Sequence, residues 1–206
     1  ELYGKLEARR LDIEEELQEL FPPIIKETIF IPKVNNKTRG YVKGQPFIKK
    51  HEETFNPSSR QHVSQRLIDK YDWKPDEYTT DGKPKVDDSV LNSLDYPEAK
   101  LLAEHFLLDK RIGQLATGNQ AWLKLVKAGR LHGTCNTNST VTARASHAYP
   151  NLAQVPSAHA PYGKECRELF TTPFNRKLVG IDVSALEVRM LAHYMAKFDN
   201  GAYTKV

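Results

Sequence analysis

The sequence predicts an α+β fold, in which a mainly helical first part precedes short strands and a final strand–helix unit. Two observations indicate this order. Apolar residues recur with helical spacing through most of residues 1–128. From residue 129 onward, short β-branched or apolar runs alternate with turn-prone residues, and an apolar run at 178–181 precedes one more helical pattern.

The first predicted element is an amphipathic helix over residues 2–21, with Leu6, Ile13, Leu17 and Leu20 on one stripe. Phe21-Pro-Pro ends this helix, since proline lacks an amide donor and clashes with the preceding turn. Residues 22–52 are rich in Pro, Gly and Asn, which predicts an insertion of loops and short strands. The insertion is basic, with one acid, Glu27, between Pro22 and Lys50 against Lys26, Lys33, Lys37, Arg39, Lys43, Lys49 and Lys50.

Four further helices are predicted, over about 57–71, 89–94, 97–116 and 119–127, with residues 73–88 as a loop. Asn56 is expected to cap the first of these, with Pro57 at its first helical position. The helix over 97–116 carries Lys110, Arg111 and Gln114 near its far end. The last helix carries Trp122, which we expect in the core.

Two antiparallel strands are predicted over 130–135 and 140–145, joined by the turn-prone residues 136–139. The apolar run 178–181 then predicts a buried strand that ends in Asp182, and Ser184 opens a buried helix. A carboxylate at a strand end is held rigidly, as a catalytic metal ligand must be. Two simpler interpretations stay open: Asp182 as a solvated loop acid, and Ser184 with Glu187 as a capping box.

The block Asp182–His193 resembles motif A of DNA polymerase family A, D-x-S-x-x-E-x-R-x-x-A-H, and agrees with it at Asp182, Ser184, Glu187, Arg189, Ala192 and His193. Upstream, Val141–Pro156 resembles the family's T-G-R-x-S/T and P-N-L-x-x-I-P segments. Phe55–His62 resembles its F-N-x-S-S thumb signature. The Ala-Gln pair at 153–154 and the segment 198–203 are similar to the short-tailed-phage replicative branch. One departure is Ala143, where the family usually has glycine.

This resemblance implies a thumb subdomain at residues 1–128, with 22–52 as its basic insertion. Residues 129–206 would form the N-terminal part of a palm subdomain, truncated after motif A. The chain is therefore expected to be an internal fragment of a DNA-directed DNA polymerase and to be inactive alone. The motif B residues that grip the triphosphate and the motif C carboxylate would lie outside it. Whether a 3′–5′ exonuclease precedes it is left open.

The resemblance also implies two Mg²⁺ ions in the complete enzyme, which clamp the attacking and leaving oxygens of nucleotidyl transfer. Asp182 would be the catalytic carboxylate and metal ligand, and the Val183 backbone carbonyl would be a further ligand. Glu187 and Ser184 would lie at the sugar of the incoming dNTP. There the Glu187 carboxylate would crowd a ribose 2′-hydroxyl and so select deoxyribonucleotides.

Primer-template DNA is the implied partner of six other residues. Arg144 would reach the purine N3 and pyrimidine O2 acceptors that every correct base pair presents in the minor groove. Asn151 and Gln154 would join the same groove or the template backbone. Three residues near the end of the thumb helix would lie along the phosphates of the duplex: Lys110, Arg111 and Gln114. The alternatives are a surface ion pair for Arg144 and a solvated helix end for the other cations.

Composition bears on three further properties: nucleic-acid binding, disulfide or zinc sites, and membrane insertion. Thirty basic and 26 acidic residues give a net charge of +4, which alone does not indicate nucleic-acid binding. Cys135 and Cys166 lie far apart without C-x-x-C spacing, so free thiols in a reducing cytoplasm (the host's, if the source is viral) are expected rather than disulfides or zinc. No apolar stretch approaches the ~18 residues of a membrane span.

Three functional questions stay open. A non-catalytic DNA-binding domain derived from such a polymerase is one alternative. A single-subunit RNA polymerase is another, which Glu187 speaks against. The 22–52 segment is a candidate site for a processivity factor, since some phage relatives carry a longer insertion that docks host thioredoxin, or for direct contact with duplex phosphates.

Overall fold

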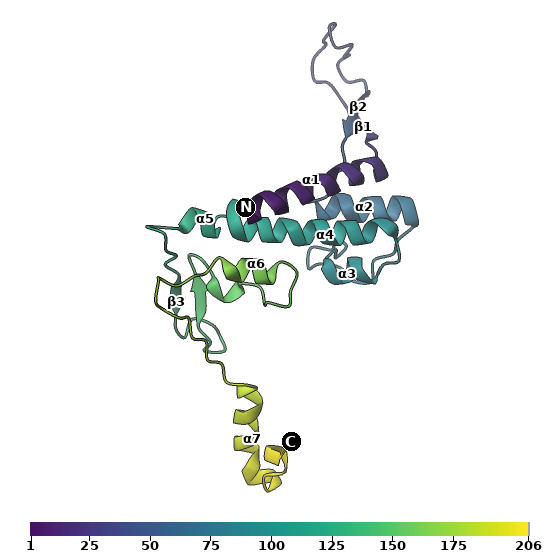
Figure 1. Ribbon diagram of the computed structural model, residues 1–206. Coiled ribbons are helices and arrows are strands. Elements are labelled where there is room, and N and C mark those ends of the chain that lie inside the picture. Colours follow the sequence, from purple (N-terminus) through teal and green to yellow (C-terminus); the bar gives the residue numbers. More distant parts are fainter. Residues whose placement is uncertain (206) are drawn as a thin grey trace. The chain divides into compact units, whose positions relative to one another are not determined.

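The computed structural model describes residues 1–205 and divides the chain into two compact units, Glu1–Val155 and the residues from Pro156 onward (Figure 1). The predicted α+β class is confirmed, because the chain forms helices and two small antiparallel sheets. The boundary expected at residue 128 concerns the subdomains of a polymerase, and it stays a prediction.

Four helices build the core of the first unit: α1 (Leu2–Leu20), α2 (Arg60–Tyr71), α3 (Asp88–Ser93) and α4 (Pro97–Ile112). Helix α1 confirms the first prediction, and its apolar stripe packs along α4. Three residues of the stripe, Leu6, Ile13 and Leu17, are almost completely buried, whereas Leu20 at its end is 36% exposed. The apolar positions of the neighbouring helices are buried as well: Val63, Leu67, Leu91, Leu102 and Leu108. Burying a leucine or isoleucine side chain of this kind stabilises the fold by about 1.5–3 kcal/mol each.

Polar contacts fix the position of α1 on α4. The Arg9 guanidinium donates two hydrogen bonds to the Glu104 carboxylate, at 2.8 and 2.9 Å. The imidazole of His105 is fully buried, and its Nε2 lies 3.1 Å from a Glu14 carboxylate oxygen. These pairs specify the register of the two helices, because a shift of either one would leave charged groups without partners.

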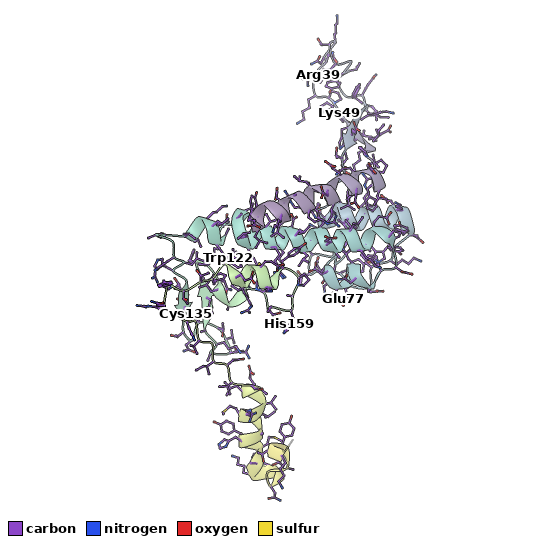
Figure 2. The ribbon with its side chains drawn as sticks, in the orientation of Figure 1. Arg39, Lys49, Glu77, Trp122, Cys135 and His159 are labelled. Atoms are coloured by element: carbon purple, nitrogen blue, oxygen red, sulfur yellow. The ribbon has the colours of Figure 1, made fainter. Side chains whose placement is uncertain are left out.

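The predicted insertion is a β-hairpin. Strands β1 (Ile24–Phe30) and β2 (Phe47–Glu53) pair antiparallel, with Ile29 opposite Ile48. Near the strands, cations are engaged: the Lys26 ammonium lies 2.7 Å from Glu53, and that of Lys49 lies 3.8 Å from the centroid of the Phe30 ring. Farther along, exposed cations lie in the segment between the strands, where Figure 2 labels Arg39.

Helix α2 begins later than predicted. Its N-cap is Ser59, whose hydroxyl accepts a hydrogen bond from the His62 N–H, and not Asn56. Asn56 instead closes the preceding turn, where its side-chain oxygen accepts from the Ser58 N–H at 3.0 Å. The local Asx turn therefore takes the place of one helical turn, since a short amide side chain competes for backbone donors. The loop and the short helix α3 that follow agree with the prediction.

The helix predicted over 97–116 changes its geometry near the end. Its α-helical part, α4, stops at Ile112, and the chain continues as a wide π turn, η1 (Gly113–Thr117). The Gly118 N–H donates to the Gly113 carbonyl at 2.9 Å and closes this turn. A Cβ atom at Gly118 would lie 2.6 Å from that same carbonyl oxygen, so the turn requires glycine. Helix α5 (Trp122–Leu125) follows, shorter than predicted.

Antiparallel pairing after residue 129 is confirmed, but with different boundaries. The strands are β3 (Thr134–Asn136) and β4 (Ser146–Ala148), and a 3₁₀ turn, η2 (Leu152–Gln154), comes next. Residues 140–145, predicted as a strand, form a turn. The reason is that their polar groups bond locally: the Ala143 N–H donates to the Thr140 carbonyl at 2.9 Å, which leaves it unavailable to a ladder.

The second unit contains α6 (Gly163–Glu168), α7 (Leu186–Asp199) and η3 (Ala202–Lys205). The buried strand predicted at 178–181 is wrong: these residues are irregular, and the Ile181 side chain is 91% exposed. No described strand pairs with them, and a strand without a partner is not stable. Helix α7 is present, but it is not buried as predicted, because among its described residues Ala192 alone is buried.

Among residues 1–205, no helix combines the length and the apolar character that crossing a membrane requires. Both cysteines carry free thiols, with Cys135 exposed and Cys166 buried.

Candidate nucleic-acid interface

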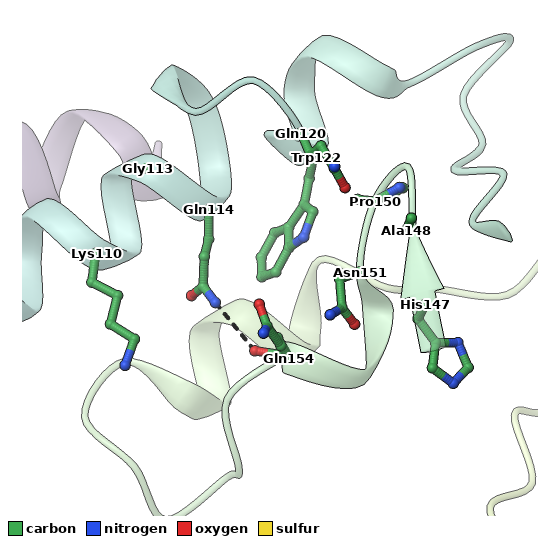
Figure 3. Close-up of a pocket in the computed structure, with 10 residues that line it drawn as sticks. All are labelled: Lys110, Gly113, Gln114, Gln120, Trp122, His147, Ala148, Pro150, Asn151 and Gln154. Atoms are coloured by element: carbon green, nitrogen blue, oxygen red, sulfur yellow. Dashed lines mark hydrogen bonds between the residues drawn. The ribbon is translucent and has the colours of Figure 1, made fainter. Parts of the chain in front are cut away.

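A cavity of about 450 Å³ lies in the first unit, where the end of α4, the η1 turn and α5 face β4 and η2 (Figure 3). Two parts of the chain that are distant in sequence form its walls: Lys110, Gly113, Gln114, Gln120 and Trp122 on one side, and His147, Ala148, Pro150, Asn151 and Gln154 on the other. No carboxylate belongs to this set. Its four side-chain amides and one ammonium suit a ligand that offers hydrogen-bond acceptors or negative charge.

Three of these side chains have polar groups that no described residue engages. The exposed Lys110 ammonium makes no ion pair within residues 1–205. Asn151 uses its side-chain oxygen to accept from the Ala153 N–H at 3.1 Å, so its NH₂ group stays available to a ligand. Gln154 is exposed, and its bonds to described residues use the backbone alone: its N–H donates to the Asn151 carbonyl and its carbonyl accepts from Gln114. The three lie on the same cavity, and their role in DNA binding stays a prediction.

Gln114 lies on the cavity as well, and each end of its amide makes one hydrogen bond with the protein. Its oxygen accepts from the Arg111 guanidinium at 3.1 Å, and its NH₂ group donates to the Gln154 carbonyl at 3.2 Å. Figure 3 shows this second bond crossing the cavity. Gln114 therefore binds protein groups on both sides.

Arg111, expected to lie along the duplex phosphates, is buried in the structure, and its role in DNA binding stays a prediction. Its side chain is only 7% exposed and bonds to Gln114. Helical periodicity explains the difference, because Arg111 follows Leu108 by three positions and so shares the buried face of α4.

Arg144 lies in the turn between β3 and β4, outside the set of residues that line the cavity. The Thr140 hydroxyl holds its backbone: it accepts from the Arg144 N–H at 2.8 Å and donates to the Arg144 carbonyl at 3.0 Å. Ala143, directly before it, adopts a left-handed conformation with φ of 59°. Few residues other than glycine take this conformation, because Cβ then lies too close to the following carbonyl.

The residues of the motif A block lie in the second unit. Asp182 is exposed in an irregular segment, and Val183 beside it is 55% exposed. The capping box suggested for Ser184 and Glu187 is absent: the N-cap of α7 is Ala185, with no side-chain cap. The Ser184 carbonyl instead accepts from the Arg189 guanidinium at 2.8 Å, and Glu187 lies in the first turn of α7.

The described residues do not form a complete magnesium site. They contain no group of three or more His, Cys, Asp or Glu side chains placed to hold a metal ion. Mg²⁺ requires near-octahedral oxygen coordination. The predicted donors of this chain, the Asp182 carboxylate and the Val183 carbonyl, are too few to make such a site by themselves.

Gln120 and His147 were not among the residues expected from the sequence to form a site. The Gln120 side-chain oxygen accepts from the Tyr149 N–H at 3.0 Å, and both Gln120 and His147 line the cavity. No spacing rule pairs residues 29 positions apart, so the contact gave no signal in the sequence. Trp122 is 5% exposed, which confirms its place in the core, and its buried ring also forms a wall of the cavity.

Comparison with known proteins agrees with the resemblance drawn from the motifs. Residues 36–198 match DNA polymerase family A. The chain is 45% identical to the DNA-directed DNA polymerase of Escherichia phage T7 over 181 residues, which cover 81% of the chain and 26% of that protein. The DNA-directed DNA polymerase of Enterobacteria phage T3 is 44% identical over the same shares. A thermostable DNA polymerase I of Thermus thermophilus is 32% identical over 143 residues, 68% of the chain and 17% of that protein. The chain thus spans about a quarter of the length of its phage relatives.

Proposed function

The chain belongs to DNA polymerase family A, and we propose that it is the part of a DNA-directed DNA polymerase that holds the primer-template duplex. In this proposal, residues 1–128 act as a thumb and residues 129–206 begin a palm. One observation supports the proposal: a single cavity without carboxylates is lined by Lys110, Asn151 and Gln154. The motif resemblance predicted that these three residues bind DNA.

The cavity side chains would bind the duplex without reading its sequence. The amide NH₂ groups of Asn151 and Gln154 donate to purine N3 and pyrimidine O2 in the minor groove, because these acceptors lie in nearly the same place for every correct pair. The Lys110 ammonium pairs with a backbone phosphate, which contributes affinity but no sequence information. A replicative polymerase needs this combination, since it must hold every sequence equally well.

Arg144 would complete the minor-groove contact from the neighbouring turn. A guanidinium has five donors in a rigid fork, so it detects a mispair that displaces an acceptor. The Thr140 hydroxyl, which bonds to the Arg144 backbone on both sides, supports this role because it fixes the starting point of the side chain.

Asp182 would contribute one carboxylate to the catalytic metal site, with the Val183 carbonyl beside it. When bound, Mg²⁺ would supply the positive charge that nucleotidyl transfer requires at the reacting oxygens. The remaining ligands would come from residues outside this chain, as would those that grip the dNTP. Glu187, with Ser184 nearby in the first turn of α7, would exclude a ribose 2′-hydroxyl.

The hairpin would add a second contact with the duplex. Lys33, Lys37, Arg39 and Lys43 are exposed between its strands, and no described residue forms an ion pair with any of them. Four unpaired cations on a short segment favour phosphate contacts. A processivity factor on the same hairpin is a second candidate, because Ile25, Ile29 and Ile48 are 69%, 75% and 52% exposed on one face of it.

Fluorescence anisotropy of a labelled duplex, titrated with the 206-residue chain at several salt concentrations, tests the proposal. The logarithm of the affinity should fall linearly with the logarithm of salt concentration, and Lys110→Ala should reduce the slope by about one, as loss of one phosphate contact does. Lys74→Ala is the matched control, since Lys74 is exposed and belongs neither to the residues that line the cavity nor to the hairpin. Affinity independent of salt, or equal effects of the two substitutions, would contradict the proposal.

A further inference from the structure

Two glutamine side chains hold the second wall of the cavity through its backbone. The Gln120 oxygen accepts from the Tyr149 N–H at 3.0 Å, at the start of the segment 149–154. The Gln114 NH₂ group donates to the Gln154 carbonyl at 3.2 Å, at its end. Each bond connects residues that are distant in sequence, by 29 and 40 positions. Asn151, which lines the cavity and whose NH₂ group bonds to no described residue, lies between the two attachment points.

The orientation of the Gln114 amide is determined by Arg111. The Arg111 guanidinium donates to the Gln114 oxygen at 3.1 Å, and a guanidinium has no acceptor. The NH₂ end of Gln114 must therefore point away from Arg111, and it points to Gln154 (Figure 3). A buried arginine thus selects one of the two amide orientations and keeps the donor directed at the opposite wall.

The η1 turn places Gln114 in its position. A π turn is wider than an α-helical turn and frequently occurs at functional sites. Here Gln114 is the second residue of the turn, and Gly118 closes it without steric conflict. Gly118 thus closes the turn that places Gln114, and Arg111 fixes the orientation of its amide.

We infer that Gln114 and Gln120 are positioning residues, which fix the backbone of 149–154 so that Asn151 and Gln154 present their side-chain amides to a nucleic-acid ligand. The inference rests on the proposed function, and it gives Gln114 a role beside the expected contact with DNA. The bond to the Gln154 carbonyl uses one of the two N–H donors of the Gln114 amide.

Glutamate substitutions at Gln114 and Gln120 distinguish the effects of the two hydrogen bonds. Both substitutions add the same charge, so a difference between the variants reports on the bonds. Gln120→Glu keeps the oxygen acceptor for the Tyr149 N–H. Gln114→Glu keeps the acceptor for Arg111 but removes the donor, and it places a carboxylate oxygen against the Gln154 carbonyl. Gln61→Glu on α2 is the matched charge control, since Gln61 is exposed outside the cavity.

The ligand test compares duplexes that contain natural purines with duplexes that contain 3-deazapurines, which lack the N3 acceptor but still form base pairs. The ratio of the two affinities cancels the general effect of charge. We expect Gln114→Glu to lower this ratio about fivefold, the loss of one well-placed hydrogen bond. Gln61→Glu should leave it unchanged, and Gln120→Met should lower it more than Gln120→Glu does.

A second measurement reports on the backbone without DNA. Amide hydrogen exchange of Tyr149 should become faster in Gln120→Met and stay slow in Gln120→Glu, with the melting temperature as a check on folding. Equal exchange in both variants, or equal affinity ratios for Gln114→Glu and Gln61→Glu, would overturn the inference. If the unmodified chain itself does not distinguish the two duplexes, the proposed function fails, whereas the exchange result still decides whether Gln120 holds the backbone.

Discussion

The Thr140 hydroxyl bonds to both backbone groups of Arg144, accepting from its N–H at 2.8 Å and donating to its carbonyl at 3.0 Å. A single side chain thus closes a five-residue turn around the arginine proposed to test base-pair geometry. The turn also forces Ala143 into the left-handed region, with φ of 59°. The position at which the family usually has glycine is therefore a position where this chain tolerates backbone strain.

Ala143→Gly is expected to raise the free energy of unfolding by about 0.5–1 kcal/mol. Relief of a left-handed alanine is worth about 1–2 kcal/mol, and the greater freedom of glycine in the unfolded chain offsets part of it. Urea denaturation monitored by circular dichroism measures the change. Ala145→Gly in the same loop is the control, because its φ is not positive, and it should destabilise. Destabilisation by both substitutions would mean that Ala143 carries no strain.

Gly118→Ala should disrupt the turn that carries Gln114. The new Cβ would meet the Gly113 carbonyl oxygen at 2.6 Å, and a backbone atom cannot move aside as a flexible side chain can. We expect a loss of about 2 kcal/mol in the free energy of unfolding, typical of overpacking. Gly113→Ala, where nothing lies within 4 Å of the added atom, should cost far less. Thermal melts of the two variants measure this difference, and equal melting temperatures would contradict a π turn that requires glycine at position 118.

The cap of α3 predicts a dependence on pH. Asp87 accepts hydrogen bonds from the Ser89 hydroxyl and from the Ser89 and Val90 amides, and the Ser89 side chain is the largest cause of a pKa lowered from 3.8 to about 2. A carboxylate with a lowered folded-state pKa stabilises fully above its unfolded value of 3.8, and this stabilisation is lost as the pH falls toward about 2.

Asp87→Ala should therefore lower the free energy of unfolding by about 1 kcal/mol at pH 7, the usual value of an N-cap. The difference from the unmodified chain should shrink below pH 4 and be smallest near pH 2. Denaturant titrations at pH 7 and near pH 2 measure this difference, with Asp81→Ala in the preceding loop as the control. A deficit that does not change with pH would show that the cap does not depend on ionisation.

Asp182→Asn tests the catalytic half of the proposal, and it requires a polymerase in which these 206 residues are joined to the remaining motifs. Replacing a charged metal ligand with a neutral amide should reduce primer extension by at least about 10³-fold while duplex affinity stays within about twofold. Asp199→Asn, on the same unit but outside motif A, serves as the control. Near-normal extension by Asp182→Asn would identify Asp182 as a solvated loop acid.

Local rules predicted the helical part well. Helical periodicity located α1 and α4, and Phe21-Pro-Pro correctly ended α1. The cap of α2 was assigned three residues too early, because Asn56 and Ser59 are both good caps and only tertiary context selects one. In residues 140–145, which precede β4, hydrogen bonds within the turn overrode β propensity, which is the weaker preference.

The cavity could be predicted only in part. Motif resemblance identified Lys110, Asn151 and Gln154, but the buried position of Arg111 depends on which face of α4 meets its neighbours. The bond from Gln120 to Tyr149 is a contact across 29 residues, which no periodicity reports. The strand predicted before Asp182 needs a pairing partner, and sequence within one segment does not show whether a partner exists.

The affinity of the chain for a natural duplex, compared with one in which purines along the contacted stretch are 3-deazapurines, tests the central claim most directly. If Asn151, Gln154 and Arg144 donate to minor-groove acceptors, removing N3 should weaken binding by about tenfold or more, since a typical hydrogen bond contributes about 0.5–1.5 kcal/mol and several are lost. The difference should shrink in Asn151→Ala and Gln154→Ala. Equal affinities of the unmodified chain for the two duplexes would contradict the account.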